Sequence, residues 1–232
     1  MKKVISFSIY GDQPMYTIGI LRNLELAKII YPDWKVYVYY NDTVPMDMIE
    51  KYKSFDNCEV FDMTNFPGPG VLWRFTPKEN VERFISRDGD SRLSMREKYA
   101  VDEWISSGKS LHIMRDHPHH GVPIYAGLVG LVVTEDLNLK NDITTFIGYN
   151  AHQNLNLFNK YIDTPFLNQY VYERFVSNGD VICHDSCHTQ FPYSKPFPTK
   201  MEDQRFIGEI YDQFDNRKEQ YREWINRKEL GY

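Results

Sequence analysis

Apolar runs and amphipathic segments alternate along the first third of the chain. Two runs rich in Val, Ile and Tyr predict buried strands, and Ile20, Leu24 and Ala27 have the spacing of a helix face. The predicted strand, helix, strand, helix and strand are, in order, 3–9, 16–30, 35–40, 45–53 and 59–63. This order is typical of an α/β fold, with a Rossmann-like, mostly parallel central sheet and helices on both faces.

The rest of the chain continues with less regular patterns. Further strands are predicted at 80–86, 111–114 and 181–184, and helices at 94–108 and 163–175. The motif Ser94-Met95-Arg96-Glu97 has the form of a capping box, which predicts a helix start. Residues from Glu202 onward are rich in charge and are predicted to be helical.

Composition narrows the class of protein. The 232 residues carry a net charge of −5 without a basic patch, which argues against a nucleic-acid polymer as partner. The 3 cysteines favour a reducing compartment over a disulfide framework. The N-terminus predicts a strand rather than a signal peptide, and no apolar run is long enough for a membrane span. We therefore expect a cytoplasmic protein, in the host cytoplasm if its source is viral.

The acidic motif Asp88-Gly89-Asp90 directly follows the fourth predicted strand. In open α/β sheets, ligands bind beyond the carboxyl ends of the strands. Two carboxylates one glycine apart can face one Mn²⁺ or Mg²⁺ ion and leave its other positions to phosphate oxygens. Arg87 and Arg92 flank the pair, where they could contact phosphates or hold the carboxylates. By itself the motif also fits a solvated turn.

Two later segments are rich in histidine and acidic residues. Asp116 follows a predicted strand and could bind sugar hydroxyls, act as a general base, or merely cap its loop. Its neighbours His117, His119 and His120 could bind zinc or have structural roles. The segment 183–188 contains two cysteines and two histidines and leaves the same alternatives open.

A set of short segments is distributed in one order over residues 3–210. The segments are Phe7-Ser8-Ile9-Tyr10-Gly11, Tyr31-Pro32-Asp33-Trp34, Leu72-Trp73-Arg74-Phe75, Arg87-Asp88-Gly89-Asp90-Ser91-Arg92, Glu97-Lys98-Tyr99-Ala100-Val101-Asp102-Glu103-Trp104, His112-Ile113-Met114-Arg115-Asp116-His117-Pro118 and Pro196-Phe197-Pro198. In this order they resemble a group of GT-A glycosyltransferases of large DNA viruses of algae and amoebae and of some bacteria. The resemblance implies a single GT-A domain over 1–232, composed of a nucleotide-binding half, a donor-sugar and acceptor half, and a C-terminal helix, at 1–90, 91–210 and 211–232.

The resemblance also implies roles for individual residues. The nucleotide contacts it implies are Ile9, Tyr10, Gly11 and Arg74, with Arg87 as a possible assistant. Gly127 and Gly130 match a donor-sugar loop, although Ala126 replaces its first glycine. Asp163 resembles the start of a helix that faces the acceptor, although Thr164 replaces a glutamine there. The resemblance also implies a late contact to the metal or the pyrophosphate, for which His184 or Asp185 would suit, with His184 as the candidate third metal ligand beside Asp88 and Asp90. A buried structural histidine is the alternative.

The sequence therefore predicts a metal-dependent transferase with Mn²⁺ or Mg²⁺ as cofactor. We expect it to move a hexose or pentose from a nucleotide diphosphate, with UDP favoured, to a hydroxyl of a glycan or glycoprotein. Asp116 and Asp163 are the candidates for sugar or acceptor contact and for catalysis. Two alternatives are a zinc-dependent hydrolase built on the His/Asp loop and a non-catalytic glycan-binding protein on a transferase fold.

Overall fold

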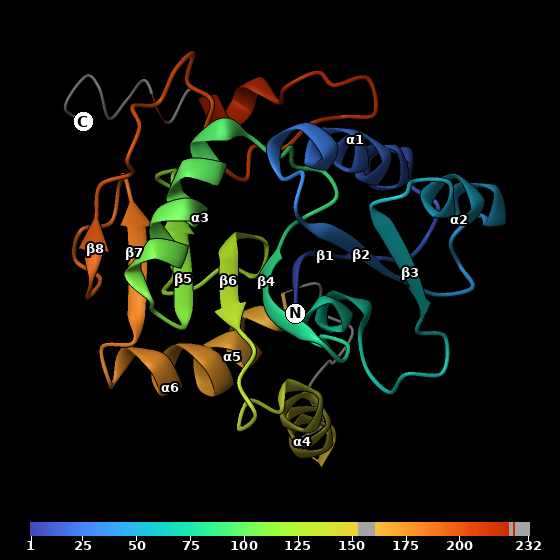
Figure 1. Ribbon diagram of the computed structural model, residues 1–232, viewed down its shortest axis with the longest axis horizontal. Helices are drawn as coiled ribbons and strands as arrows, with labels where there is room; N and C mark the ends of the chain where they lie inside the picture. The colour runs from blue at the N-terminus through green and yellow to red at the C-terminus, as the bar shows by residue number, and fades with distance from the viewer. Residues whose placement is uncertain (153–160, 223–224, 226–232) are drawn as a thin grey trace.

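An eight-stranded sheet forms the centre of the computed structural model, which describes residues 1–152, 161–222 and 225 (Figure 1). The strands lie in the order β3-β2-β1-β4-β6-β5-β7-β8. Their bounds are β1 Lys2–Ile9, β2 Lys35–Tyr40, β3 Cys58–Asp62, β4 Val81–Ser86, β5 Leu111–Arg115, β6 Val129–Val132, β7 Val181–Asp185 and β8 Ser194–Lys195. Of the described strands, β6 alone is antiparallel to its neighbours, β4 and β5. The predicted α/β class and mostly parallel sheet are confirmed.

Helices cover both faces of this sheet (Figure 1). The α-helices are α1 Pro14–Ile30, α2 Met46–Lys53, α3 Met95–Ser107, α4 Leu139–His152, α5 Asp163–Leu167 and α6 Glu173–Val176. The two 3₁₀ turns are η1 Gly70–Phe75 and η2 Ala126–Leu128, and a π-helical turn, η3 Asn168–Tyr172, joins α5 to α6. The predicted helix at 163–175 thus exists, with a π-helical interruption.

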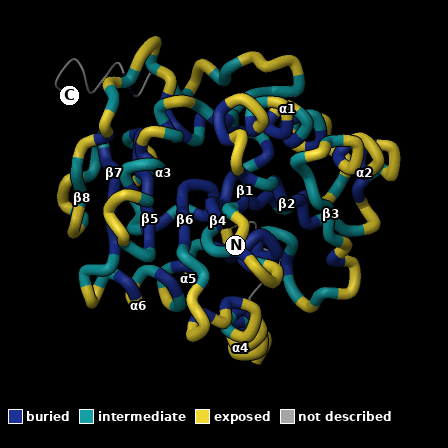
Figure 2. The backbone as a smooth tube through the Cα atoms, viewed as in Figure 1, coloured by how far each residue is buried: buried dark blue, intermediate teal, exposed yellow. Residues whose placement is uncertain are grey.

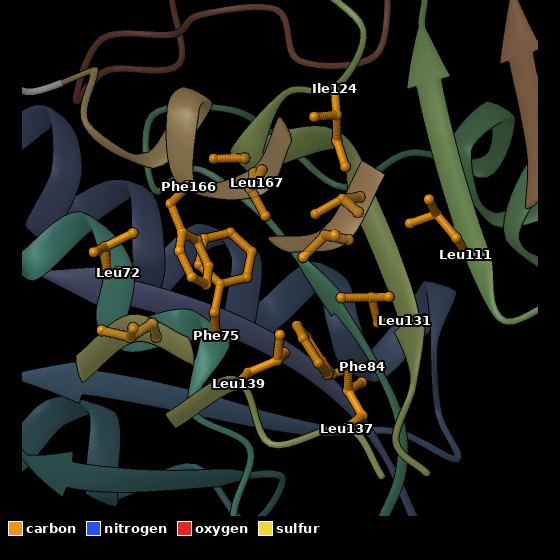
Figure 3. Packing of buried hydrophobic residues seen from close by; sticks show 14 of the residues in the cluster. Leu72, Phe75, Phe84, Leu111, Ile124, Leu131, Leu137, Leu139, Phe166 and Leu167 are labelled. Carbon is orange, nitrogen blue, oxygen red and sulfur yellow. The ribbon is translucent and has the colours of Figure 1, made fainter. Parts of the chain in front are cut away.

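Two hydrophobic clusters connect the layers. One packs α1, α2 and α3 on one face of the sheet and includes Leu24, Ile49 and Trp104. The other packs η1, α4 and α5 on the opposite face (Figure 3). The strands at the middle of the sheet are accordingly buried, while the outer faces of α2 and α4 are exposed (Figure 2). Because both faces are covered, the strands are apolar on both sides, as expected for a parallel sheet.

Local signals explain the start and the end of α3. Ser94 is its N-cap, and the Ser94 Oγ accepts a hydrogen bond of 3.2 Å from the Glu97 backbone N–H. Gly108 ends the helix in the left-handed conformation, with φ of 69°. The predicted helix start is therefore confirmed, and the polypeptide between β4 and α3 is a short turn.

Two parts of the chain differ from the prediction. Helix α4 was not predicted, although its buried residues Leu139, Ile143 and Phe146 have helical spacing. The helix predicted from Glu202 onward is wrong for 202–218, which forms turns and irregular segments in which Tyr211 and Arg217 make an isolated antiparallel bridge. The Tyr211 backbone N–H donates to the carbonyl of Asp90 at 2.8 Å, so this segment gains its hydrogen bonds from the fold rather than from a helix of its own. Most residues beyond 222 lie outside the described part of the chain.

A separate feature concerns membranes. Within the described residues, no helix is both long enough and apolar enough to cross a bilayer.

Candidate functional site

The turn after β4 presents two carboxylates at the carboxyl edge of the sheet. The side chain of Asp88 is half exposed, and the backbone N–H and hydroxyl of Ser91 both donate to the Asp88 carbonyl, which closes the turn. Burial and the neighbouring charge of Asp88 raise the pKa of Asp90 to about 6. Two neighbouring negative charges oppose each other's ionisation. A cation between them would relieve that repulsion.

Arg74 from η1 connects this turn to α5. One nitrogen of its guanidinium donates to Asp88 Oδ1 at 2.5 Å, and the other donates to Asp163 Oδ2 at 3.2 Å. Burial raises the pKa of Asp163, and the charge of Asp88 adds to this effect while that of Arg74 opposes it. Arg74 and Asp163 are almost fully buried, so these ion pairs are shielded from water.

The hydrophobic core holds Arg74 and Asp163 in position. Phe75 follows Arg74 in η1, and Phe166 lies one turn after Asp163 in α5. The two rings contact each other at a centroid distance of 6.2 Å, as Figure 3 shows. The polar pair is therefore placed by packing between elements that are far apart in the sequence.

Two glycines allow the acidic turn to be approached closely. A Cβ atom on Gly127 would lie 1.9 Å from Asp88 Oδ2, and a Cβ on Gly19 would lie 2.0 Å from the carbonyl oxygen of Gly89. Neither distance is sterically possible for a real side chain. Gly127 in η2 thus leaves the space that the Asp88 carboxylate occupies, and Gly19 lets α1 pack directly on the turn.

The end of β1 lies beside the same site. Ser6 Oγ donates to the carbonyl of Arg74 at 2.7 Å, which joins β1 to η1. Beyond the strand, Tyr10 is half exposed and its ring meets Trp73 edge to face at 6.1 Å. Gly11 adopts a left-handed φ of 73°, and its N–H donates to Thr43 Oγ1 at 2.7 Å. The predicted nucleotide segment therefore adjoins Arg74, with Ile9 buried and Tyr10 open to solvent.

Arg87 has surroundings that differ from the prediction. Its side chain is 2% exposed, and its Nε donates to Glu97 Oε1 at 2.9 Å. Its Nη1 donates to the carbonyls of Ser86 and Val129 at 2.6 and 3.1 Å. A guanidinium enclosed between β4, β6 and α3 cannot reach a nucleotide from this position. Arg87 therefore has an internal role and does not belong to the site around Arg74.

Asp116 is also removed from solvent. Its side chain is fully buried, and the Nε and Nη2 of Arg96 donate to its two oxygens at 2.8 and 2.7 Å. Ser186 Oγ and the Ile207 backbone N–H donate to the same carboxylate at 2.6 and 3.0 Å. A carboxylate that accepts four hydrogen bonds has no free lone pair directed at a substrate. The expectation that Asp116 contacts sugar or acts as base is therefore corrected.

Gly130 and His184 likewise lie away from the acidic turn. Gly130 is in the middle of β6, where a Cβ would meet the Trp104 ring at 2.9 Å, so it serves packing rather than a donor loop. His184 is fully buried, and its ring nitrogens lie 2.9 Å from His112 Nε2 and 3.1 Å from Glu103 Oε2. These contacts match the structural alternative for His184.

The loop histidines also have structural partners. The His117 ring contacts that of Phe206 at a centroid distance of 4.3 Å, and its Nε2 lies 2.8 Å from the carbonyl of Tyr221. The backbone N–H of Asp116 donates to His120 Nδ1 at 3.1 Å. In the described part of the chain, no group of three or more His, Cys, Asp or Glu side chains is placed to hold a metal ion. The acidic pair nevertheless suits Mn²⁺ or Mg²⁺, because such ions are often held by one or two carboxylates together with substrate phosphates.

Two residues near the acidic turn were not predicted. Burial, followed by the charges of Asp90 and Asp88, raises the pKa of Tyr16 to about 12, so its phenol lies within electrostatic reach of both carboxylates. Lys218 is close enough that its charge lowers the pKa of Asp90 against the larger opposing effects. Nothing in the local sequence marks Lys218, because the contact of its segment with the turn arises only on folding.

Comparisons with known proteins describe a shared arrangement of elements. No protein-family model and no curated protein matches the chain. TarS 1-349 of S. aureus, solved with UDP-GlcNAc, is 18% identical with a TM-score of 0.38; the match covers 53% of this chain and 35% of TarS, about a third of its length. A glycosyltransferase involved in glycosylation of the PBCV-1 major capsid is 16% identical, with coverages of 80% and 82% and a TM-score of 0.41.

A third similar structure is an enzyme of a different kind. The 4-diphosphocytidyl-2C-methyl-D-erythritol synthase of Anaerococcus prevotii is 10% identical, covers 72% of this chain and 83% of its own, and has a TM-score of 0.44. With TM-scores below 0.5, none of these similarities assigns a function to this chain. The assignment must come from the residues of the site itself.

Proposed function

We propose that this protein is a GT-A glycosyltransferase that moves a sugar from a nucleotide diphosphate, UDP in the first instance, to a hydroxyl of a glycan. The observation that supports it most directly is the pair Asp88 and Asp90 at the carboxyl end of the parallel strand β4, joined through Arg74 to Asp163. The carboxyl ends of such strands are where open α/β sheets bind their ligands. The ordered resemblance of the sequence segments supports the same class.

The acidic pair would hold the metal. Asp88 and Asp90 provide the carboxylate oxygens that Mn²⁺ or Mg²⁺ prefers. When bound, such an ion neutralises the negative charge that develops on a diphosphate leaving group. Arg74 fixes the orientation of Asp88, because its guanidinium is itself held by Asp163 and by the carbonyl of Arg87 at 2.9 Å. Lys218 adds a positive charge near Asp90.

The remaining roles follow from position. Tyr10 and Gly11, at the end of β1, would lie against the nucleotide, and the exposed Tyr10 ring offers a surface for a base. Gly127 would border the donor sugar, because it contacts the carboxylate of Asp88. Asp163 is the remaining candidate for sugar or acceptor contact, and its raised pKa makes it a better proton acceptor than an ordinary aspartate. The four hydrogen bonds that Asp116 accepts inside the fold support Asp163 over Asp116 for this role.

A thermal-shift experiment tests this function. The melting temperature is measured with Mn²⁺, with UDP and with both together. At about 100 times the dissociation constant, binding adds about 2.7 kcal/mol, which shifts the melting temperature of a chain of this size by roughly 5–10 °C. We expect this shift only when both ligands are present, since the diphosphate completes the coordination of the metal.

Variants test whether the shift in melting temperature depends on the acidic pair. Asp88→Asn with Asp90→Asn should abolish the joint shift, while Glu135→Gln with Asp136→Asn removes the same charge from an exposed loop and should preserve it. Release of UDP from a UDP-sugar should follow the same pattern. A stabilisation by Zn²⁺ alone would instead favour the hydrolase, and no response to either ligand would favour a non-catalytic protein.

A further inference from the structure

A groove lies outside the proposed donor site, between α1, the start of α3 and the segment 199–217. Its volume is about 810 Å³, which is within the usual size of ligand sites, and a neighbouring hollow has a volume of about 530 Å³. Its apolar lining comes from both helices and from the C-terminal segment: Leu26, Ile29, Met95, Tyr99, Phe206 and Tyr211. Ile29 is 78% exposed and Tyr99 47% exposed, so this surface is open to a ligand.

The lining of this groove is rich in positive charge. Three carboxylates, Glu25, Glu202 and Asp215, accompany six basic residues: Arg22, Arg92, Arg96, Lys200, Arg205 and Arg217. This local excess occurs in a chain with a net charge of −5. The lining therefore holds more basic than acidic side chains, which is the reverse of the chain as a whole.

Some of these cations are held in place and others are not engaged. Arg96 is fixed by the buried carboxylate of Asp116, and Arg217 by Glu209 at 2.6 Å. Arg22 pairs with Glu25 and Asp215, each at 3.2 Å, and Arg92 pairs with Asp215 at 2.8 Å, so all four charges are largely compensated. In the described part of the chain, no ion pair is found for the exposed Lys200 and Arg205. These two side chains therefore provide the uncompensated charge at the rim.

The neighbouring hollow extends the same basic surface. It shares Arg205 and Arg217 with the groove and adds Arg222. The Nε of Arg222 is buried without a hydrogen-bond partner among the described residues.

The groove also adjoins the acidic turn. Tyr211, which lines it, donates its backbone N–H to the carbonyl of Asp90 at 2.8 Å. Arg92, also in the lining, donates to the carbonyl of Ser91 at 2.9 Å. Two residues that line the groove therefore also contact the acidic turn on which the proposed transfer depends.

We propose that this groove binds an acidic carbohydrate chain that serves as the acceptor. Exposed aromatic and aliphatic side chains offer surfaces to sugar rings, and the arginine and lysine side chains pair with carboxylate or phosphate groups. The binding itself needs only the groove, whereas the role as acceptor rests on the proposed glycosyltransferase function.

Calorimetric titration of the full chain tests the binding. The probes are an oligogalacturonide for carboxylates, a phosphorylated mannose oligosaccharide for phosphates, neutral maltohexaose and inorganic phosphate. We expect at least one of the two acidic oligosaccharides to bind, more tightly than the neutral one, with an affinity that falls as salt is added. Whichever of the two binds more tightly identifies the acidic group.

Charge-reversal variants locate the binding to the groove. Lys200→Glu with Arg205→Glu should weaken it by about tenfold or more, which corresponds to ~1.4 kcal/mol. The matched control, Lys78→Glu with Lys140→Glu, reverses two exposed charges elsewhere and should leave the affinity unchanged. Tyr99→Ala should weaken binding of the oligosaccharide without changing its dependence on salt.

Several results would overturn the proposal: equal binding of maltohexaose, binding of inorganic phosphate with the same affinity, or no effect of the double reversal. So would a dimer that the double reversal dissociates, because the groove would then hold a second copy of the chain. The shift in melting temperature with Mn²⁺ and UDP tests the donor site separately. If that shift is absent while the acidic oligosaccharide still binds, the transferase proposal fails and the binding site remains.

Discussion

At the scale of single residues, the geometry of the acidic turn depends on the absence of a side chain at Gly127. The carboxylate of Asp88 occupies the space that any side chain at this position would fill. A clash with a charged oxygen at such short range forces one of the two groups to move. The geometry of Asp88 is therefore decided by a residue that has no chemistry of its own.

Gly127→Ala should consequently impair ligand binding more than stability. We expect the joint Mn²⁺ and UDP shift to be lost or reduced at least about tenfold in apparent affinity, because Asp88 must leave its position. Gly148→Ala is the matched control, since a Cβ there has nothing within 4 Å and the residue lies in α4. It should be neutral or stabilising by up to about 1 kcal/mol. An unchanged shift in Gly127→Ala would show that Asp88 does not bind the metal.

Asp116 differs from Gly127, because its carboxylate is fully hydrogen-bonded to other residues of the fold. Asp116→Ala should destabilise the protein by about 3–5 kcal/mol, since it leaves the Arg96 guanidinium without its buried partner. Urea unfolding measures this loss. Below its melting temperature the variant should still respond to Mn²⁺ with UDP, and its rate of UDP release should fall by less than about tenfold. A much larger loss of rate in a stable variant would restore a catalytic role.

At the scale of elements, α1 and the turn after β4 form one unit. Gly19 in α1 is in contact with the carbonyl of Gly89, and Asn23 Nδ2 donates to the carbonyl of Ser91 at 2.8 Å. The N-terminal turns of the helix thereby bring Tyr16 close to the two carboxylates. The helix would have to shift as a whole to admit a side chain at position 19.

Gly19→Ala tests this contact. Although alanine normally favours a helix, we expect a destabilisation of about 1–3 kcal/mol because the added methyl group overpacks the helix against backbone. The joint ligand shift should weaken too, since the turn is displaced. Glu25→Ala, at an exposed position of the same helix, is the control and should change stability by less than about 0.5 kcal/mol. Stabilisation by Gly19→Ala would mean that the helix and the turn are less tightly coupled than the contact indicates.

At the scale of the whole molecule, buried histidines connect stability to pH. Burial holds the pKa of His112 well below its usual 6.5 and lowers that of His120 to about 3. The unfolded chain therefore binds protons that the folded chain does not, so stability must fall as pH falls below about 6.5. Asp90 has the opposite effect between about 3.8 and 6, where its raised pKa makes the folded state take up a proton. The pKa values of His117 and His184 are also lowered and that of Asp163 is also raised, so four histidines oppose two carboxylates and we expect a net loss of stability.

Urea unfolding between pH 7.5 and 5 measures this dependence. The fully buried His112 should contribute a slope of up to about 1.4 kcal/mol per pH unit. His112→Gln should lower stability at every pH but reduce the slope, whereas His152→Gln, at the exposed end of α4, should leave the slope unchanged. A stability that is constant or increases from pH 7.5 to 5 would contradict the assignment of neutral buried histidines.

Much of the fold was determined by local patterns in the sequence. Period-two and helical spacing, Pro32 and the Ser94 cap are short-range signals, so the order of strands and helices through α3 was predictable. The acidic pair at the end of β4 was predictable for the same reason, because a strand followed by a turn orders it locally. Helix α4 was missed although its spacing was readable, and 202–218 was misassigned because charge alone does not distinguish a helix from a segment held by other elements.

The tertiary structure alone decided which partner each polar residue has. Arg87 and Asp116 pair with Glu97 and Arg96 on α3, whereas Arg74 pairs with Asp163 and with the half-exposed Asp88 of the acidic turn. The antiparallel strand β6 also placed Gly130 against a core ring while leaving Gly127 beside Asp88. The burial and the partners of a side chain depend on residues that are distant in the sequence, so a local pattern does not predict them. The sequence by itself therefore determined the elements and the acidic turn, and the fold determined the partners of every charge.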